Sequence, residues 1–249
     1  MEKYRILLCV VLLLFSCFSG TYQNQVFAKT KQEYVEQGEV IWELPTKEKL
    51  IALTFDDGPH AVYTPQILDL LLEYDAKATF FIIGSRMNQH QDIVRRQLAE
   101  GHEHGNHTFN HERFSRLSKE QIWQELKLTE QEYHNLTGHH LNPYFRPPGG
   151  RYNERIVEAV VERGYQVVMW SWHQDSRDWS KPGVQKIIDN VLGGTRPGDI
   201  VLFHDSGGNR KQTVEALKTI LPALVQSGYR MVTLSELMLV NQLGTSDLK

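Results

Sequence analysis

The stretch Leu50-Ile-Ala-Leu-Thr-Phe-Asp-Asp-Gly-Pro59 joins an apolar run to two adjacent carboxylates and a turn pair. A short run rich in aliphatic and aromatic residues and bounded by Gly-Pro is typical of a strand buried on both faces, here at 51–55. Asp, Gly and Pro also form plain turns. Two carboxylates directly after a buried strand, however, repel each other and need a cation or separate partners. The stretch therefore predicts a buried strand with reactive residues at its carboxyl end.

Apolar runs of strand length continue to alternate with amphipathic stretches of helix length beyond this point. Strands are expected at 78–83, 144–145, 166–170, 199–203 and 230–233, and helices from 64 onward, at 93–100, from the capping box 118–121, and at 153–163, 184–191 and 213–226. Such β-α alternation predicts a parallel sheet covered by helices. The simplest architecture is one α/β domain, a complete or incomplete (β/α) barrel, with an open doubly wound sheet as the alternative.

The composition is that of an ordinary globular protein and excludes several other classes. The 249 residues are 41% hydrophobic and 23% charged, with 27 basic and 30 acidic side chains. These fractions argue against long disorder, collagen and coiled coils. The small negative net charge gives no electrostatic reason to expect nucleic-acid binding. The length alone allows one large domain or two small ones.

The first 28 residues have the pattern of a secretory signal. Lys3 and Arg5 precede a 13-residue apolar run at 6–18, which is short for a membrane span, and a cleavage pattern ends at Ala28. An uncleaved N-terminal anchor and lipidation at Cys17 are the alternatives. Cleavage after Ala28 would leave a chain without cysteine, which suits a secreted or surface-associated bacterial protein.

Five clusters of reactive side chains follow or end predicted strands. They are Asp56-Asp57, Asn106-His-Thr-Phe-Asn-His111, Arg146-Pro-Pro-Gly-Gly150, Asp175-Ser-Arg-Asp-Trp179 and His204-Asp205. Each cluster alone has an ordinary interpretation, such as a turn, a surface pair or a core histidine. In a (β/α) barrel, however, the carboxyl ends of all strands meet on one face, where the active site lies. Clusters as far apart as Asp56 and His204 are therefore expected to share one site, which favours a single domain.

The histidine pair points to a metal ion. His107 and His111 are spaced i, i+4, which places two imidazoles on one helical face, a spacing that recurs at zinc sites. With Asp57 as a third ligand, the pair and the carboxylate doublet explain each other. Two His and one carboxylate with open positions are typical of a catalytic site, because a structural zinc is closed by four protein ligands.

The five clusters together resemble the polysaccharide deacetylases, carbohydrate esterase family four, over about Leu50 to Met238. The resemblance implies a distorted (β/α) barrel with seven or eight strands, and metal-dependent removal of N- or O-acetyl groups from glycans. On this basis the chain divides into a signal peptide at 1–28, an N-terminal arm or linker at 29–48, a catalytic domain at 49–240 and a C-terminal tail at 241–249.

The resemblance also implies roles for the carboxylates and their neighbours. Asp57, His107 and His111 would bind the metal. Asp56 would be the general base that activates the attacking water, and Arg146 would hold Asp56 in its ionised form. The ion is expected to be zinc, with cobalt, nickel or manganese as alternatives, because such a ligand set accepts several divalent ions.

The last two clusters would supply the acid and the pocket. His204 would be the general acid for the leaving amine and Asp178 would orient it, with Asp175 a less favoured candidate. Trp179 and Leu202 would form the wall around the acetyl methyl group.

Three positions depart from the family pattern or fall beside it. Gly149 stands where the family usually has an aromatic residue, whose backbone N–H serves the oxyanion; the N–H remains, on a more flexible backbone. His104 stands where the family tends to be aliphatic, and we expect a solvent-facing neighbour rather than a tuning group. His60 follows the doublet and is a candidate for substrate contact.

The expected function is metal-dependent hydrolysis of N-acetyl groups of cell-wall or chitin-type N-acetylglucosamine polymers, with release of acetate. An O-acetyl esterase and a non-catalytic glycan-binding barrel are the alternatives. The expected partner is the N-acetylated glycan, peptidoglycan or a chitooligosaccharide, with no nucleic acid and no obligate protein partner.

Overall fold

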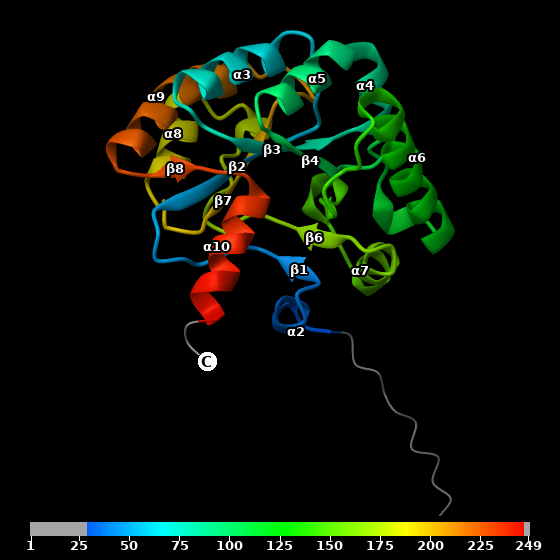
Figure 1. Ribbon diagram of the computed structural model, residues 1–249. Helices are drawn as coiled ribbons and strands as arrows, with labels where there is room; N and C mark the ends of the chain where they lie inside the picture. Colours follow the sequence, from blue (N-terminus) through cyan, green and yellow to red (C-terminus); the bar gives the residue numbers. More distant parts are fainter. Residues whose placement is uncertain (1–28, 247–249) are drawn as a thin grey trace, which may run out of the picture.

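The strands form one curled parallel sheet in this computed structural model, which describes residues 29–246 (Figure 1). They are β1 (Val40–Ile41), β2 (Leu50–Asp56), β3 (Ala78–Ile82), β4 (Glu103–Asn106), β5 (Tyr144–Phe145), β6 (Gln166–Val168), β7 (Ile200–His204) and β8 (Arg230–Met231). Seven strands follow the order β1-β6-β5-β4-β3-β2-β7, and β8 pairs with the start of β2. Strands β2 to β6 are neighbours in chain order without the reversal of a doubly wound sheet. The predicted distorted (β/α) barrel is therefore confirmed, as a half-barrel with flanking helices.

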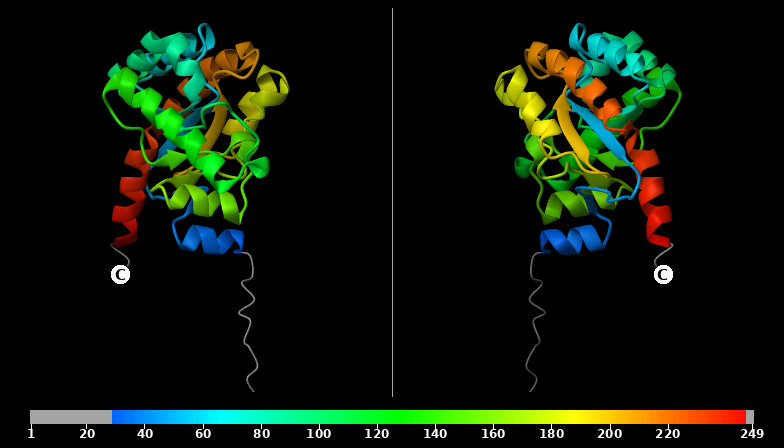
Figure 2. Two further views of the ribbon diagram at one scale, coloured as in Figure 1. Left: turned by 90° about the vertical axis from the view of Figure 1, so that its right-hand side faces the viewer. Right: turned by 90° about the vertical axis from the view of Figure 1, so that its left-hand side faces the viewer.

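Helices surround the outside of this sheet, as the two side views show (Figure 2). They are α2 (Lys31–Glu36), α3 (Tyr63–Glu73), α4 (Gly84–Met87), α5 (Gln91–Ala99), α6 (Lys119–Thr137), α7 (Glu154–Val161), α8 (Val184–Leu192), α9 (Lys211–Gln226) and α10 (Leu234–Ser246). The predicted capping box opens α6, where the Ser118 hydroxyl accepts from the Gln121 N–H, and Gly138 ends the helix at a φ of 74°. Within residues 29–246, no helix is both long enough and apolar enough to cross a membrane.

Strand β2 lies next to the edge strand β7 and sets the register of the site. All seven of its residues are buried, between β3 on one side and β7 on the other. The Phe55 ring stacks on Phe80 and Phe203 with centroid separations of 5.1 and 5.5 Å. This register places Asp56 directly opposite His204, so the packing of the core brings two predicted site residues together.

The gap between the sheet edges β1 and β7 is closed by an irregular segment, residues 169–178, which follows β6. The Ser171 N–H donates to the Ile200 carbonyl, and the Leu202 N–H donates to the Gln174 carbonyl, both at 3.0 Å. Asp175 forms an isolated parallel bridge with Leu202. The segment thus continues the pairing along β7 and brings the Asp175–Trp179 cluster to the carboxyl end of the sheet.

Two ends of the expected domain differ from the prediction. Residues 29–48 are not a loose arm: α2 begins at a capping box on Thr30, and β1 pairs in parallel with β6. The buried side chains of Tyr34 and Val40 explain this order, because they pack in an apolar cluster with Phe145, Val157 and Val167 despite the polar local composition. Helix α10 continues through residues 241–246, which were expected to belong to a tail. The signal segment 1–28 and residues 247–249 lie outside the described residues.

Strand β4 was not predicted as a strand. Its sequence, Glu103-His-Gly-Asn106, lacks the apolar run that marks β2 and β3, yet three of its four residues are buried. Gly105 explains the close packing, since a Cβ there would lie 2.6 Å from the Phe81 ring. Strand β4 carries the chain directly into the His107–His111 segment.

Candidate active site

The carboxylate doublet at the end of β2 divides between two different partners. Asp56 is the last residue of the strand, and Asp57 follows with a φ of 74°. Asp56 Oδ1 accepts from Arg146 Nη1 at 2.8 Å. Asp57 Oδ1 instead lies 3.5 Å from His107 Nε2 and 3.2 Å from His111 Nε2. The turn thus separates the two charges, as their mutual repulsion requires.

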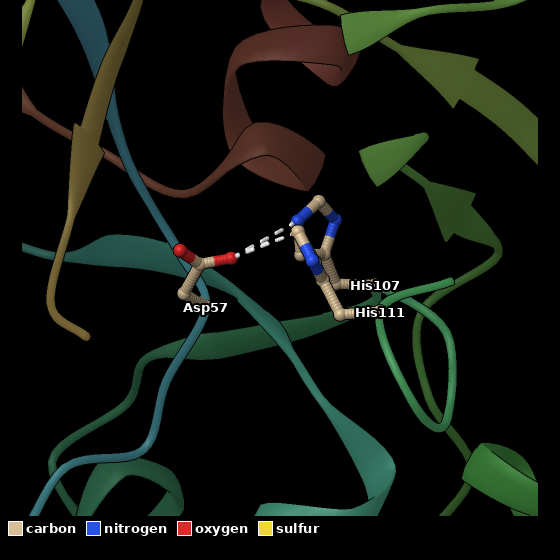
Figure 3. Close-up of side chains that lie close together, drawn as sticks. All are labelled: Asp57, His107 and His111. Carbon is tan, nitrogen blue, oxygen red and sulfur yellow. Dashed lines mark ion pairs between the residues drawn. The ribbon is translucent and has the colours of Figure 1, made fainter. Parts of the chain in front are cut away.

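Asp57, His107 and His111 form a set of metal-ligand type. One carboxylate oxygen and one nitrogen from each imidazole lie within 4.8 Å of one another, and the carboxylate points toward both rings (Figure 3). The His107 Nδ1 lies 2.7 Å from the Arg146 carbonyl, so Nδ1–H donates there and Nε2 keeps its lone pair for the set. Burial would raise the pKa of Asp57, but the imidazoles of His107, His204 and His111 hold it far below its usual range.

The two histidines do not lie on a helix, so the helical spacing predicted from i, i+4 is wrong. The segment is a loop, with positive φ at Thr108 (73°) and His111 (59°). Side chains hold it: Asn106 Oδ1 accepts from the Thr108 N–H, and Thr108 Oγ1 accepts from the His111 N–H, both at 2.9 Å. These side-chain bonds replace the helical ladder, and they bring the two imidazoles together by a different local path.

Arg146 is fully buried and forms a hydrogen-bonded ion pair with Asp56. Its guanidinium donates to Asp56, to Thr54 Oγ1 at 2.7 Å, and to the carbonyls of Val168 and Met169 at 3.0 and 2.8 Å. Burial lowers the pKa of Arg146, while the charge of Asp56 opposes that change. Four acceptors fix the planar group in one orientation, so the Asp56 carboxylate is also fixed.

His204 and Asp178 form a second, separate pair at the end of β7. His204 Nδ1 lies 2.7 Å from Asp178 Oδ1, and Asp178 Oδ2 accepts from the His204 N–H at 2.9 Å and from Thr213 Oγ1 at 2.8 Å. Burial alone would lower the pKa of His204, but Asp178, followed by Asp56 and Asp57, raises it to about 9. These contacts favour the protonated imidazole. Asp175 has no such contact and accepts from the Arg177 N–H, so the structure selects Asp178.

These groups share one groove of about 640 Å³. Its lining comprises Asp56, Asp57, His107, His111, Arg113, Phe114, Pro148, Gly149, Gly150, Arg151, Trp170, Asp175, Trp179, Leu202 and His204. Trp179 presents 54% of its surface to solvent, whereas Leu202 is buried in the wall. Gly149 has a φ of 65° with open space around its Cα. Trp172, also exposed, does not line this groove.

His104 and His60, which the sequence analysis also named, lie outside the groove and make structural hydrogen bonds. His104 is fully buried rather than facing solvent: its ring nitrogens contact the Tyr133 hydroxyl at 3.1 Å and Gln97 Oε1 at 2.9 Å. Burial lowers the pKa of His104 to about 3, so it is neutral in the core. His60 Nδ1 accepts from the Val62 N–H at 3.0 Å, and His60 is not among the groove residues.

Asp205 is a buried group beside the site, named in the sequence only as part of the His204-Asp205 cluster and without a role of its own. Thr64 Oγ1 donates to it at 2.6 Å, and a Cβ on Gly58 would lie 2.2 Å from its Oδ2. Burial, with the charge of Asp57, raises the pKa of Asp205 to about 7. Its position directly after His204 was the only sequence signal. The carboxyl supports the turn that carries Asp57.

The fold is a parallel (β/α) half-barrel, and its groove combines a His₂Asp set, an arginine-held carboxylate and a histidine paired with Asp178. This combination is typical of hydrolases that use a metal ion. The model of the polysaccharide deacetylase family matches residues 43–168. The chain is 49% identical to a peptidoglycan-N-acetylglucosamine deacetylase of Bacillus cereus over 208 residues, covering 84% of this chain and 97% of the relative. It is 38% identical to a chitooligosaccharide deacetylase of Rhizobium leguminosarum bv. trifolii, covering 78% and 94%.

The solved structures agree with these sequence matches. The crystal structure of the Bc1960 peptidoglycan N-acetylglucosamine deacetylase has a TM-score of 0.79 and 34% identity, covering 84% of this chain and 97% of that one. The chain therefore belongs to the polysaccharide deacetylase family and is a hydrolase of non-peptide carbon–nitrogen bonds. Enzymes of this family are generally metal-dependent, and Asp57, His107 and His111 have the donor types and spacing that such an ion requires.

Proposed function

We propose that this enzyme removes acetyl groups from N-acetylglucosamine residues of peptidoglycan and releases acetate. One observation carries the proposal: a carboxylate held by arginine and a histidine favoured in its protonated form are register partners, Asp56 and His204, beside a His₂Asp set in one groove. Amide hydrolysis needs a base for water and an acid for the poorly leaving amine, and this pair has the matching chemistry.

Asp57, His107 and His111 would hold a divalent ion, zinc being the first candidate by donor type. When bound, such an ion polarises the acetamide carbonyl and makes a water molecule more acidic. The fixed Nδ1–H···O=C bond of His107 presents its Nε2 lone pair without reorganisation. Cobalt, nickel and manganese remain alternatives for the native ion.

The chain's own groups would carry the proton transfers. Asp56 takes the proton from the attacking water, while the Arg146 contact keeps its carboxylate oriented. His204 then gives its proton to the amine nitrogen as the carbon–nitrogen bond breaks, and Asp178 stabilises the charged imidazole before that step. The Gly149 N–H is the candidate donor to the oxyanion. Trp179 and Leu202 would enclose the acetyl methyl group.

Charge on the groove rim favours peptidoglycan over chitin. Arg113 and Arg151 are exposed and line the groove. In the described part of the chain, neither contributes to an ion pair. Peptidoglycan carries carboxylates on its stem peptides, whereas chitin is neutral, so the two arginines match the anionic polymer. The relative at 49% identity and the solved structure at a TM-score of 0.79 are also named peptidoglycan deacetylases.

The proposal is tested by acetate release from purified peptidoglycan, chitopentaose and acetylxylan, with metal-depleted and zinc-reconstituted enzyme. We expect release from peptidoglycan with zinc and none after depletion. Release from acetylxylan alone would identify an O-acetyl esterase, and glycan binding without any release would identify a binding barrel. Arg113→Ala and Arg151→Ala should each lower kcat/KM on peptidoglycan by up to roughly fivefold, the value of an exposed ion pair, and leave chitopentaose unchanged.

We further propose that the enzyme acts outside the cytoplasmic membrane, because residues 1–28 have the pattern of a secretory signal. N-terminal sequencing of protein recovered from the culture medium and from the membrane fraction tests this. A start at Lys29 supports cleavage after Ala28. A full-length membrane-bound chain, or a start at a lipid-modified Cys17, would replace it with an anchored form.

A further inference from the structure

A second group of metal-ligand type lies at the other end of the barrel. Glu43 follows β1, His173 belongs to the segment that closes the sheet, and Asp199 immediately precedes β7. One carboxylate oxygen from each acidic residue and one ring nitrogen of His173 lie within 4.8 Å of one another. Asp199 and His204 flank opposite ends of the same strand, and none of the three residues lines the active-site groove.

The group is built into the structure rather than spread over a surface. The side chains of Asp199 and His173 are only 3% and 10% exposed, and His173 Nε2 lies 3.1 Å from the Asp199 carboxylate. The Arg196 N–H donates to Asp199 Oδ2 at 2.7 Å and fixes it. The remaining ring nitrogen, His173 Nδ1, is buried and has no hydrogen-bond partner among the described residues. Among the described residues, the ring is therefore held by a hydrogen bond through Nε2 alone.

The location is the gap between the two edge strands, where the sheet has no continuous ladder. The Leu44 N–H donates to the Gly198 carbonyl at 2.9 Å, and a Cβ on Gly198 would lie 2.2 Å from the Leu44 carbonyl oxygen. The connection after β1 is therefore pressed directly against the start of β7. A ligand bound by all three of Glu43, His173 and Asp199 would link the two sheet edges and the closing segment.

We propose that Glu43, His173 and Asp199 bind a second divalent ion of the first transition row. This ion links the two edges of the half-barrel, between which the sheet has no continuous ladder. One imidazole and two carboxylates suit zinc or manganese, and water can complete the coordination on the exposed Glu43 side. The three ligands come together only in the folded chain, so the ion stabilises the native state by mass action. This role is structural and independent of the proposed deacetylation.

Zinc stoichiometry of the untagged, metal-depleted protein tests the site, by titration calorimetry and by metal analysis after gel filtration. We expect two equivalents for the wild type, one for Glu43→Gln, and two for Glu48→Gln, a matched exposed glutamate in the same connection. In an Asp57→Ala/His111→Ala background, one equivalent should remain and should disappear when Glu43→Gln is added. A single equivalent in the wild type, or two in Glu43→Gln, would overturn the proposal.

Thermal unfolding provides the second readout. In the Asp57→Ala/His111→Ala background, zinc at about 100 times its Kd should raise Tm by roughly 5–10 °C. The same zinc should leave the Tm of the triple variant that also carries Glu43→Gln unchanged. An equal rise in both variants would show that the stabilising ion binds elsewhere.

Discussion

Asp178→Asn tests whether the hydrogen bond to Asp178 keeps His204 protonated, as the general acid of the reaction must be. A carboxylate only accepts hydrogen bonds, so Asp178 Oδ1 requires a proton on His204 Nδ1 at 2.7 Å. An asparagine can still accept from the His204 N–H and from Thr213 through one oxygen. Its NH₂ group would then face the His204 Nδ1 and favour the neutral ring with Nδ1 unprotonated. The variant thus removes the charge while it keeps the neighbouring hydrogen bonds.

The size of the effect follows from the pKa of His204, about 9 in the protein against an ordinary value of 6.5. If the variant returns the pKa to that ordinary value, the charged fraction at pH 8 falls from roughly 90% to roughly 3%, about a 30-fold loss of the acid form. At pH 6 the charged fraction changes by less than about twofold. The rate defect should therefore be small in acid and grow steeply with pH.

The same shift predicts a stability change with a definite sign. Because the folded pKa is raised, the ion pair contributes its full stability below pH 6.5 and loses it as the pH rises through about 9. At pH 7 this contribution is about 2–3 kcal/mol. Denaturant unfolding of wild type and Asp178→Asn should show this difference at pH 7 and a much smaller one at pH 10.

The assay is kcat/KM for acetate release from pH 5.5 to 9.5 at saturating zinc. We expect the alkaline limb to move from about pH 9 toward 6.5 in Asp178→Asn. Asp175→Asn is the control, because Asp175 lines the same groove without contact to His204; its alkaline limb should stay in place. An equal loss of rate at every pH in Asp178→Asn would refute the reasoning.

Three further substitutions test the rest of the site. Asp56→Asn should lower kcat by at least ~10², the usual contribution of a general base. Metal analysis should show that the variant keeps its zinc. Loss of zinc would contradict the conclusion that Asp56 is not one of the metal ligands. Arg146→Met should cost about 3–5 kcal/mol in denaturant unfolding, because it leaves the buried charge of Asp56 unpaired; a near-wild-type midpoint would contradict the pairing. Gly150→Ala should lower stability by more than Gly149→Ala, since φ is positive at both but only the Cβ at 150 would meet Trp170, at 2.5 Å; equal midpoints would exclude that clash.

Much of the fold was predictable from the sequence because its signals are local. The apolar runs at Leu50–Phe55 and Ala78–Ile82 and the capping box at Ser118 correspond directly to β2, β3 and the start of α6. Polar β4 and the two-residue β1 were missed because their burial comes from neighbours distant in the chain. A strand without an apolar run has no periodic signal to detect.

The sequence by itself determined which chemical groups the protein brings to its site. The order of the five clusters along β-α units required the carboxyl ends of the strands to converge, so Asp56, Asp57, His107, Arg146 and His204 belonged to one site before any distance was known. The resemblance to the family then implied their expected roles as ligands, base and acid.

Only the tertiary structure decided how those groups are paired. It assigned His204 to Asp178 rather than Asp175, placed His104 in the core, and put His107 and His111 on a loop instead of a helix. It also placed Glu43 beside His173 and Asp199. The physical reason is that a hydrogen bond or a ligand set depends on atoms a few ångströms apart. Those separations are fixed by strand register, by the segment closing the sheet and by backbone turns with positive φ, none of which is encoded at a single position of the chain.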